Sequence, residues 1–282
     1  MKYTKFIAIF MALLLSLSLF SCSGCKKDGN VGDNGAASTP ADGAESPTSP
    51  EEEKEPLPID SIKAVMEIAG EYFGLSDMSY SRIYTVKTES ADASREDKIT
   101  SDIIINGLGT ADDGVFEKTN DGKSDRQIVC IGGTAYIYTK NAELESKVKM
   151  GGKVEEYIPE VAALIDATLY KNISLGKKTD GVQLTLKGMK SEDFACFAIG
   201  LNKADFSSGA EFKTEILKYS FDPNEDISVI IKVNNDGKLE SLTLKASYSH
   251  NGETVTVSDS YFVSYEAQSV KLPTDAADYV EG

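Results

Sequence analysis

The residues best suited to covalent chemistry are four cysteines and a single histidine. Cys130 and Cys196 each stand in an apolar stretch. We expect them to be buried core residues or, outside the cytoplasm, partners in a disulfide. A cysteine nucleophile would need a neighbouring base. His250 precedes Asn251 and Gly252, which predicts a surface turn, and one histidine cannot build a multi-histidine metal site. The sequence therefore predicts neither a catalytic cysteine nor a metal centre.

The acidic residues form no complete motif. Asp222, Asn224 and Asp226 have the alternate spacing that begins a calcium loop, but Ile227 and Val233 stand where that loop needs glycine and glutamate. We interpret this stretch as an acidic turn. The pair Glu155-Glu156 could be imagined as an acid and a base for glycosidic bonds, but nothing fixes the separation of the two carboxyl groups. The sequence predicts no catalytic residue, no cofactor and no metal.

The overall charge excludes one class of partner. The chain of 282 residues has 29 Lys and Arg against 45 Asp and Glu, which gives a formal charge of −16. Nucleic-acid binding needs clustered basic side chains, so we expect no nucleic-acid partner. Hydrophobic residues make up 41% of the chain, which is an ordinary globular balance.

The first residues are typical of an export signal. Lys2 and Lys5 precede a stretch of about 14 mostly apolar residues, shorter than the roughly 20 that span a bilayer as a helix. The sequence Leu19-Phe20-Ser21-Cys22 resembles the lipobox of bacterial lipoproteins. The resemblance implies cleavage after residue 21 and acylation of Cys22, with Cys25 as the alternative acylated residue. An ordinary secreted protein is the other interpretation. Two or more acyl chains would anchor the protein stably to the extracytoplasmic side of the cell membrane.

Residues 22–57 are predicted to be a disordered tether. From 23 to 57 they contain no aromatic residue, four of the eight prolines and the run Glu51-Glu52-Glu53. Such a segment cannot bury enough apolar surface to offset its ordering entropy. Residues 58–282 have no comparable break, and we expect them to form one β-rich domain.

Three helices are predicted in this domain. The first begins after Pro58 and Asp60 and ends at Gly74, with apolar residues at helical spacing. The second covers roughly 158–170, with Pro159 at its first position. The third covers roughly 191–203, with Ser191 as its N-cap.

The remaining stretches predict antiparallel strands. Alternating residues run along 99–106, 227–233 and 254–265, and strands at 126–131 and 134–139 flank Gly132-Gly133. Residues 172–188 predict two short strands joined at Thr179-Asp180-Gly181. The last strand has an apolar face and a face rich in serine and threonine. The predicted fold class is mostly β α+β: a strongly curved antiparallel sheet, or half-barrel, whose concave face is covered by about three helices.

This order of elements is similar to that of the bacterial lipoprotein carriers of the LolA and LprG/LppX superfamily, and to Firmicutes lipoproteins of the same half-barrel type. The likeness covers about 58–282. It rests on Gly132-Gly133-Thr134-Ala135-Tyr136-Ile137-Tyr138 with Lys147-Val148-Lys149-Met150, on Ile231 to Leu239, and on the ending Val270-Lys271-Leu272-Pro273. The resemblance implies acyl chains held between sheet and helices, with no catalysis.

Two interpretations of the apolar lining remain open. The candidate ligand-binding residues are Ile103, Ile105, Tyr136, Tyr138, Phe194, Phe197, Leu201, Val257 and Tyr261. They either line a pocket for a lipid or other apolar ligand or simply form the core. The first interpretation predicts a monomeric, membrane-anchored lipid-binding protein. The second predicts an envelope structural or interaction lipoprotein with a filled core and a protein partner whose identity the sequence does not indicate.

Overall fold

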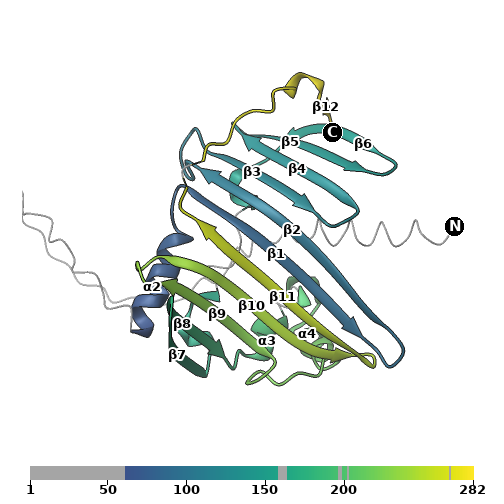
Figure 1. Cartoon of the computed structure of the whole chain (residues 1–282). Helices are drawn as coiled ribbons and strands as arrows, with labels where there is room; N and C mark the ends of the chain where they lie inside the picture. Colours follow the sequence, from purple (N-terminus) through teal and green to yellow (C-terminus); the bar gives the residue numbers. More distant parts are fainter. Residues whose placement is uncertain (1–60, 158–163, 196–198, 202, 267) are drawn as a thin grey trace, which may run out of the picture. The chain divides into compact units, whose positions relative to one another are not determined.

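The computed structural model describes residues 61–157, 164–195, 199–201, 203–266 and 268–282. The signal sequence and tether predicted for 1–57 lie outside these residues. Within the described ranges, one open, curved sheet of twelve strands dominates the unit from Pro58 to Gly282 (Figure 1). The predicted fold class, a mostly β half-barrel, is confirmed.

The sheet order is β12-β6-β5-β4-β3-β2-β1-β11-β10-β9-β8-β7. All neighbours pair antiparallel except β12 and β6, which are parallel. The strands are β1 (Met78–Glu89), β2 (Ser94–Asn106), β3 (Gly114–Asn120), β4 (Ser124–Ile131), β5 (Thr134–Asn141), β6 (Glu145–Gly151), β7 (Asn172–Lys178), β8 (Gly181–Lys187), β9 (Ile227–Asn234), β10 (Leu239–His250), β11 (Glu253–Ser264) and β12 (Val280–Glu281).

The predicted hairpins are confirmed. Gly132 and Gly133 join β4 to β5 with φ angles of 57° and 76°, a left-handed pair that glycine adopts without steric cost. Thr179 and Asp180 join β7 to β8 as expected, and Gly181 begins β8. The three strands β9, β10 and β11 form the predicted meander.

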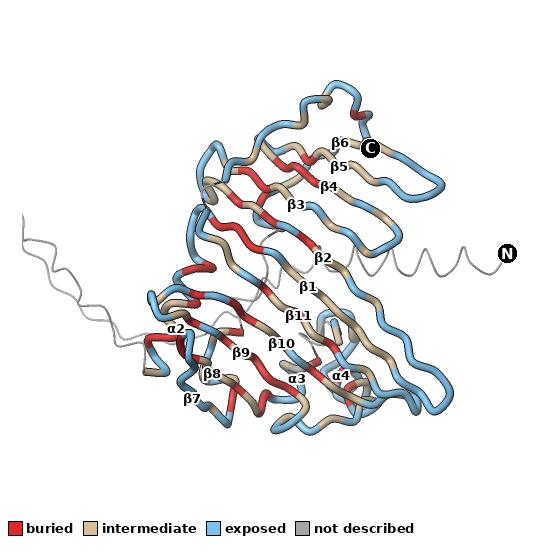
Figure 2. Tube along the Cα trace, in the orientation of Figure 1, coloured by how far each residue is buried: buried red, intermediate tan, exposed pale blue. Residues whose placement is uncertain are grey.

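Register divides the sheet into two faces, because directly paired residues lie on the same side and neighbours along a strand on opposite sides. We call the side that packs α2 the helix face, and the other the outer face. Buried aliphatic side chains from β8 to β11 fill the helix face, including Leu184, Ile231 and Leu242. Figure 2 shows buried positions recurring along these strands. These residues form the main core together with side chains of β1 to β5.

The first predicted helix is confirmed as α2 (Ile62–Tyr72). Its N-cap is Ser61, whose hydroxyl oxygen accepts a hydrogen bond from the Ala64 backbone N–H at 3.1 Å. Val65 and Ala69 on its buried side join the main core. The helix lies against β9 and β10.

The prediction of a second helix over 158–170 is wrong for residues 164–170, which the structure describes. Residues 158–163 lie outside the described residues, and η3 (Ala167–Leu169) is a single 3₁₀ turn. Asp166 explains this shape, because its carboxylate accepts hydrogen bonds from the Thr168 backbone N–H at 2.8 Å and from the Thr168 hydroxyl at 2.7 Å. Such local side-chain bonds compete with a continuous helix. A separate 3₁₀ helix, η1 (Val154–Tyr157), lies just before residue 158 and contacts β3.

The third predicted helix is shorter than expected. The α-helical part is α3 (Ser191–Phe194), and Lys190 rather than Ser191 occupies the N-cap position. Gly200 has a φ angle of 72°, which ends the helical path before residue 203. A helix that was not predicted, α4 (Gly209–Ile216), follows. It buries Phe212 and Ile216 in a second, smaller cluster beside α3.

The outer face at β2 to β6 carries a segment that we call the strap, residues 268–282. The amide of Asn106 on β2 donates to the Gln268 carbonyl at 2.9 Å and accepts from the Val270 N–H at 2.6 Å. The strap then reaches β6, where β12 pairs with Val148 and Lys149 (Figure 1). Among the described helices, none combines the length and the apolar character needed to cross a membrane.

Candidate ligand-binding face

Four of the nine predicted lining residues lie together on the helix face. Ile103 and Ile105 of β2 and Val257 and Tyr261 of β11 all belong to the main core, and none is more than 6% exposed. Phe73 from the end of α2 packs its ring edge-on to Tyr261, with centroids 6.2 Å apart. At these four positions the residues therefore form core, which is one of the two interpretations that the sequence left open.

Tyr136 and Tyr138 are placed on the opposite side of the sheet from these four. Their neighbours Ala135 and Ile137 pack on the main core, so the two tyrosines point to the outer face. Tyr136 packs against Tyr279 of the strap, and the Tyr138 hydroxyl donates to Glu145 at 3.2 Å. The prediction that they line the same space as Ile103 is wrong, because register sets the face of every residue along a strand.

Two of the remaining three predicted residues, Phe194 and Leu201, lie in or near α3, and the third, Phe197, lies outside the residues that the structure describes. Leu201 is half-buried and packs on the small cluster of Phe212 and Ile216. Phe197 lies outside the described residues, and the side chain of Phe194 is not described. Leu201 is thus the one residue of these three whose side chain is described, and it packs on the second, smaller cluster rather than on the main core.

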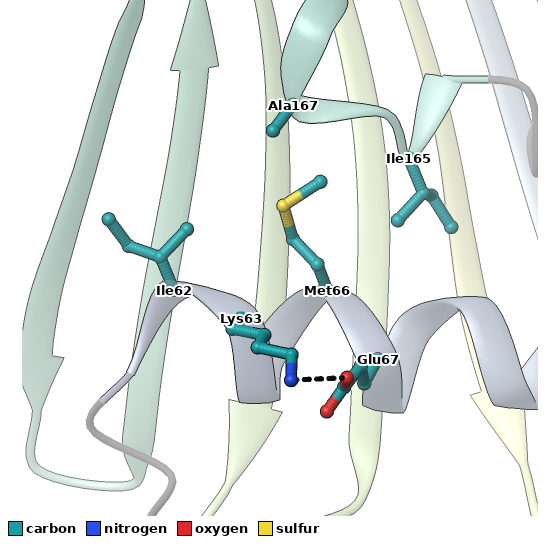
Figure 3. A pocket seen from close by; sticks show the side chains of 6 residues that line it. All are labelled: Ile62, Lys63, Met66, Glu67, Ile165 and Ala167. Carbon is teal, nitrogen blue, oxygen red and sulfur yellow. Dashed lines mark ion pairs between the residues drawn. The ribbon is translucent and has the colours of Figure 1, made fainter.

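An apolar pocket of about 480 Å³ lies beside α2, away from the residues that the sequence predicted. Its lining is Ile62, Lys63, Met66, Glu67, Ile165 and Ala167 (Figure 3). The α2 residues come from the flank of the helix next to its buried side. Met66 and Ile165 also pack on the main core, so the pocket floor continues into it.

One ion pair lies among the residues that line this pocket. The Lys63 ammonium is 3.5 Å from the Glu67 carboxylate, and both side chains are exposed, at 79% and 41% (Figure 3). Their stems add to the apolar lining while the charged groups stay in water. The arrangement suits a ligand with an apolar body and a polar end, and it contains no group placed for covalent chemistry.

A signal for this pocket was present in the sequence. The apolar stripe of α2 includes Ile62 and Met66, one turn apart, in addition to Val65 and Ala69. In the fold, Val65 and Ala69 are fully buried whereas Ile62 is 39% exposed, so part of this stripe lies beyond the contact with the sheet. The opposite wall could not be predicted, because Ile165 and Ala167 belong to the stretch that was interpreted as a regular helix.

The helix face also contains a polar cluster that the sequence did not suggest. Arg82 on β1 donates to both carboxylate oxygens of Asp259 on β11, at 2.8 and 2.9 Å, and the Tyr261 hydroxyl donates to the same carboxylate at 3.0 Å. The guanidinium carbon lies 5.5 Å from the ring centroids of Tyr84 and Tyr261. Burial raises the pKa of Tyr261 well above its ordinary value, so its hydroxyl stays protonated and donates.

The other chemistry-bearing residues are placed as follows. His250 is the last, partly buried residue of β10, and the turn that was predicted to include it consists of Asn251 and Gly252. Its ring stacks on Tyr219 at 4.4 Å, and its Nδ1 is 3.1 Å from the Lys218 carbonyl oxygen. Cys130 is fully buried in the main core, and Cys196 lies outside the described residues.

The acidic turn at 222–226 binds its own backbone. Asp226 accepts from the Asp222 N–H at 2.7 Å, and Asp222 accepts from the Asn224 N–H at 2.9 Å. Asp222 and Asp226 thus cap the turn, as interpreted from the sequence. No group of three or more potential metal-ligating side chains occurs among the residues that the structure describes.

Comparison with known proteins gives distant likenesses to solved structures. No family model matches the chain, and neither does any curated protein. Among solved structures, a LolA superfamily protein from Nitrosomonas europaea is 10% identical with a TM-score of 0.22, covering 76% of this chain and 95% of that one. A DUF1329 family protein from Desulfovibrio piger is 11% identical with a TM-score of 0.19, covering 77% and 99%. MucB, solved in complex with MucA, is 7% identical with a TM-score of 0.15, covering 77% and 94%.

Proposed function

We propose that this protein is a membrane-anchored, extracytoplasmic lipoprotein that binds a lipid or other apolar ligand without catalysis. The observation that carries the proposal is the apolar pocket of about 480 Å³ between α2 and residues 165–167. The pocket is shallow and open to solvent, and its lining is mostly apolar with the polar groups at one side, which suits an apolar ligand that has a polar end. Binding would be driven by burial of the ligand's apolar surface, at about 25 cal/mol per Å².

Membrane attachment would come from the acylated Cys22. Two or more acyl chains on one residue hold a protein stably at a bilayer. The test is the variant Cys22→Ala, expressed in a bacterial host and fractionated. We expect the wild-type protein in the membrane fraction and the variant in the aqueous fraction. A variant that stays fully membrane-bound would contradict acylation of Cys22.

Ligand binding is tested by native mass spectrometry of protein prepared without detergent, and by titration with a fluorescent fatty acid. We expect a copurified lipid or saturable binding of the probe. Met66→Glu places a charge in the pocket and should weaken probe binding at least tenfold. Leu217→Glu is the matched control, because Leu217 is an exposed apolar residue of the α4 C-cap, outside the pocket lining.

The result that would overturn lipid binding is equally definite. If no lipid copurifies and the probe binds wild type and Met66→Glu with the same affinity, the pocket is not a ligand site. Thermal unfolding of both variants separates weaker probe binding from a loss of structure: a Met66→Glu variant that binds weakly but still unfolds cooperatively has lost the site and not the fold.

A second candidate function is an envelope structural or interaction protein with a filled core. The burial of Ile103, Ile105, Val257 and Tyr261 favours it, since at these positions the side chains form core rather than line an open cavity. This function predicts a protein partner that crosslinks to the tethered domain in intact cells. A domain that binds no apolar probe but crosslinks specifically to one envelope protein would favour this function over lipid binding.

A further inference from the structure

The strap, residues 268–282, occupies a built site on the outer face of the sheet. The site is formed by Asn106 on β2, Gly114 on β3, Tyr136 on β5, and Lys147 and Lys149 on β6. Val270 lies directly over Gly114, where an added Cβ would come within 3.2 Å of it. The close approach indicates that the surface is shaped to the strap.

Charge is complementary across this contact. The Lys147 ammonium is 2.6 Å from Asp275 and 3.6 Å from Asp278, and the Lys149 ammonium is 3.1 Å from Glu281. The hydrogen bond from Lys147 lowers the pKa of Asp275, and the same bond raises the pKa of Lys147. In a chain of charge −16, two lysines on one edge strand thus face three acids of the strap.

One aromatic side chain anchors the strap. Tyr279 is 6% exposed and meets the Tyr136 ring edge-on, with centroids 5.5 Å apart. The next strap residue, Val280, is 63% exposed. Beyond Tyr279, the strap is held by parallel pairing of two residues with β6 and by the Gly282 N–H, which donates to the Lys149 carbonyl at 3.0 Å.

The electrostatic part of this contact is weak. The acids of the three ion pairs are 41% to 80% exposed, so the pairs contribute little and are screened by salt. The two residues of β12 form the end of the sheet and cover only part of β6, the neighbouring strand of seven residues, so the rest of that edge of β6 is left without a paired strand among the described residues. An edge strand of this kind accepts an added strand from another polypeptide.

We propose that this outer-face site binds an extended acidic peptide of a partner protein, with an aromatic residue flanked by carboxylates, and that the strap occupies the site in cis as its competitor. The partner would add a strand parallel to β6, place its aromatic ring against Tyr136 and pair its acids with Lys147 and Lys149. The site lies on the opposite face of the sheet from the main core and does not depend on lipid binding.

The experiment uses the full chain and a fluorescent peptide with the sequence of residues 273–282. In the variant Asp275→Ala/Tyr279→Ala, the strap has lost its anchor and its shortest ion pair. We expect the peptide to bind this variant at least tenfold more tightly than it binds wild type. A scrambled peptide of the same composition should not bind.

Two further substitutions test the basic side of the site. Lys147→Glu, added to the variant Asp275→Ala/Tyr279→Ala (the loosened variant), should abolish peptide binding. Lys187→Glu is the matched control, because Lys187 is also a strand lysine in an ion pair but lies on β8, outside the site. Its ammonium is 3.1 Å from the Glu225 carboxylate. It should leave peptide binding unchanged. Equal loss in both variants would contradict the proposed site.

If the loosened variant does not fold, hydrogen exchange of the wild-type chain with and without the peptide provides the test. Excess peptide should displace the strap and speed exchange of the Gly282 amide, while amides in β9 and β10 stay protected. If saturating peptide leaves the Gly282 amide unchanged, the strap is a permanent part of the sheet and the proposal is wrong. It is also wrong if a folded variant with an open strap fails to bind the peptide.

Discussion

At the scale of single residues, Asp259 has the least expected environment. Every second residue of β11 points to the helix face. Val257, Tyr261 and Val263 are apolar or aromatic residues of this series, and Asp259 stands among them. It is buried there because the Arg82 guanidinium and the Tyr261 hydroxyl satisfy its oxygens. The pattern of the strand could be predicted from its sequence, but the partner from β1 could not.

Loss of the Asp259 charge should destabilise the fold. Asp259→Asn leaves Arg82 without its counter-ion, and we expect about 2 kcal/mol of lost stability, below the value for a fully buried pair because Arg82 is partly exposed. Urea unfolding measures this. The control Glu89→Gln breaks an exposed pair with Lys87 on the same strand β1 and should leave the midpoint unchanged. Equal midpoints for all three proteins would contradict a role of the cluster in stability.

Tyrosine burial predicts how stability changes at high pH. Burial raises the pKa of Tyr72 to about 12, against a smaller opposing effect of its hydrogen bond to Ser79. Between pH 10 and 12 the unfolded chain therefore loses this proton before the folded chain does. Stability is fully present below pH 10 and falls as pH rises, by about 1.4 kcal/mol per pH unit for each such tyrosine. Tyr72→Phe should make the decline in urea-unfolding free energy shallower; an unchanged slope would show that Tyr72 ionises as easily when folded.

At the scale of elements, strands could be predicted better than mid-chain helices. The meander β9 to β11 follows from two-residue alternation and from turns such as Asn234 to Gly237. The helix α4 was missed, although Ser208 and Glu211 have the spacing of a capping box and the Ser208 hydroxyl does accept from the Glu211 N–H at 3.2 Å. Its short apolar stripe, Phe212 and Ile216, was too weak a periodic signal to find it.

The β7–β8 hairpin depends on a single glycine. Gly181 has a φ angle of 153°, and a Cβ there would lie 2.0 Å from the Val233 carbonyl oxygen of β9. Gly181→Ala should therefore cost at least about 3 kcal/mol or prevent pairing of β8 with β9. Gly176→Ala is the control on β7, where the nearest atom would be 4.0 Å away, and it should be nearly neutral. Similar melting temperatures for the two variants would show that β9 can move aside.

At the scale of the whole sheet, the two halves differ in how they are covered. Strands β8 to β11 carry a continuous apolar core, with α2 packed on β9 and β10, whereas β6 exposes Met150 and carries the strap on its outer side. The sequence predicted one curved, helix-covered sheet but assigned Tyr136 and Tyr138 to its inner side. The face of a strand follows from register with its neighbours, which a single strand's pattern does not contain.

This difference predicts uneven protection from hydrogen exchange. Local opening requires less free energy where fewer apolar contacts are lost. We expect backbone amides of β5 and β6 to exchange at least tenfold faster than those of β9 and β10 in the intact protein. Mass spectrometry of peptic fragments measures this, with unfolded protein as the reference for intrinsic rates. Uniform protection across the sheet would instead indicate a single cooperative unit.

The distribution of arginine has a practical consequence. The chain has only three arginines, Arg82, Arg95 and Arg126, and they stand in β1, β2 and β4 with their backbones paired to neighbouring strands. A protease must draw an extended segment into its own cleft, so a hydrogen-bonded strand resists cutting until it detaches. An arginine-specific protease should therefore leave the native domain intact and cut it only as these strands separate. Digestion rate against urea concentration would then report the opening of the sheet centre without any label.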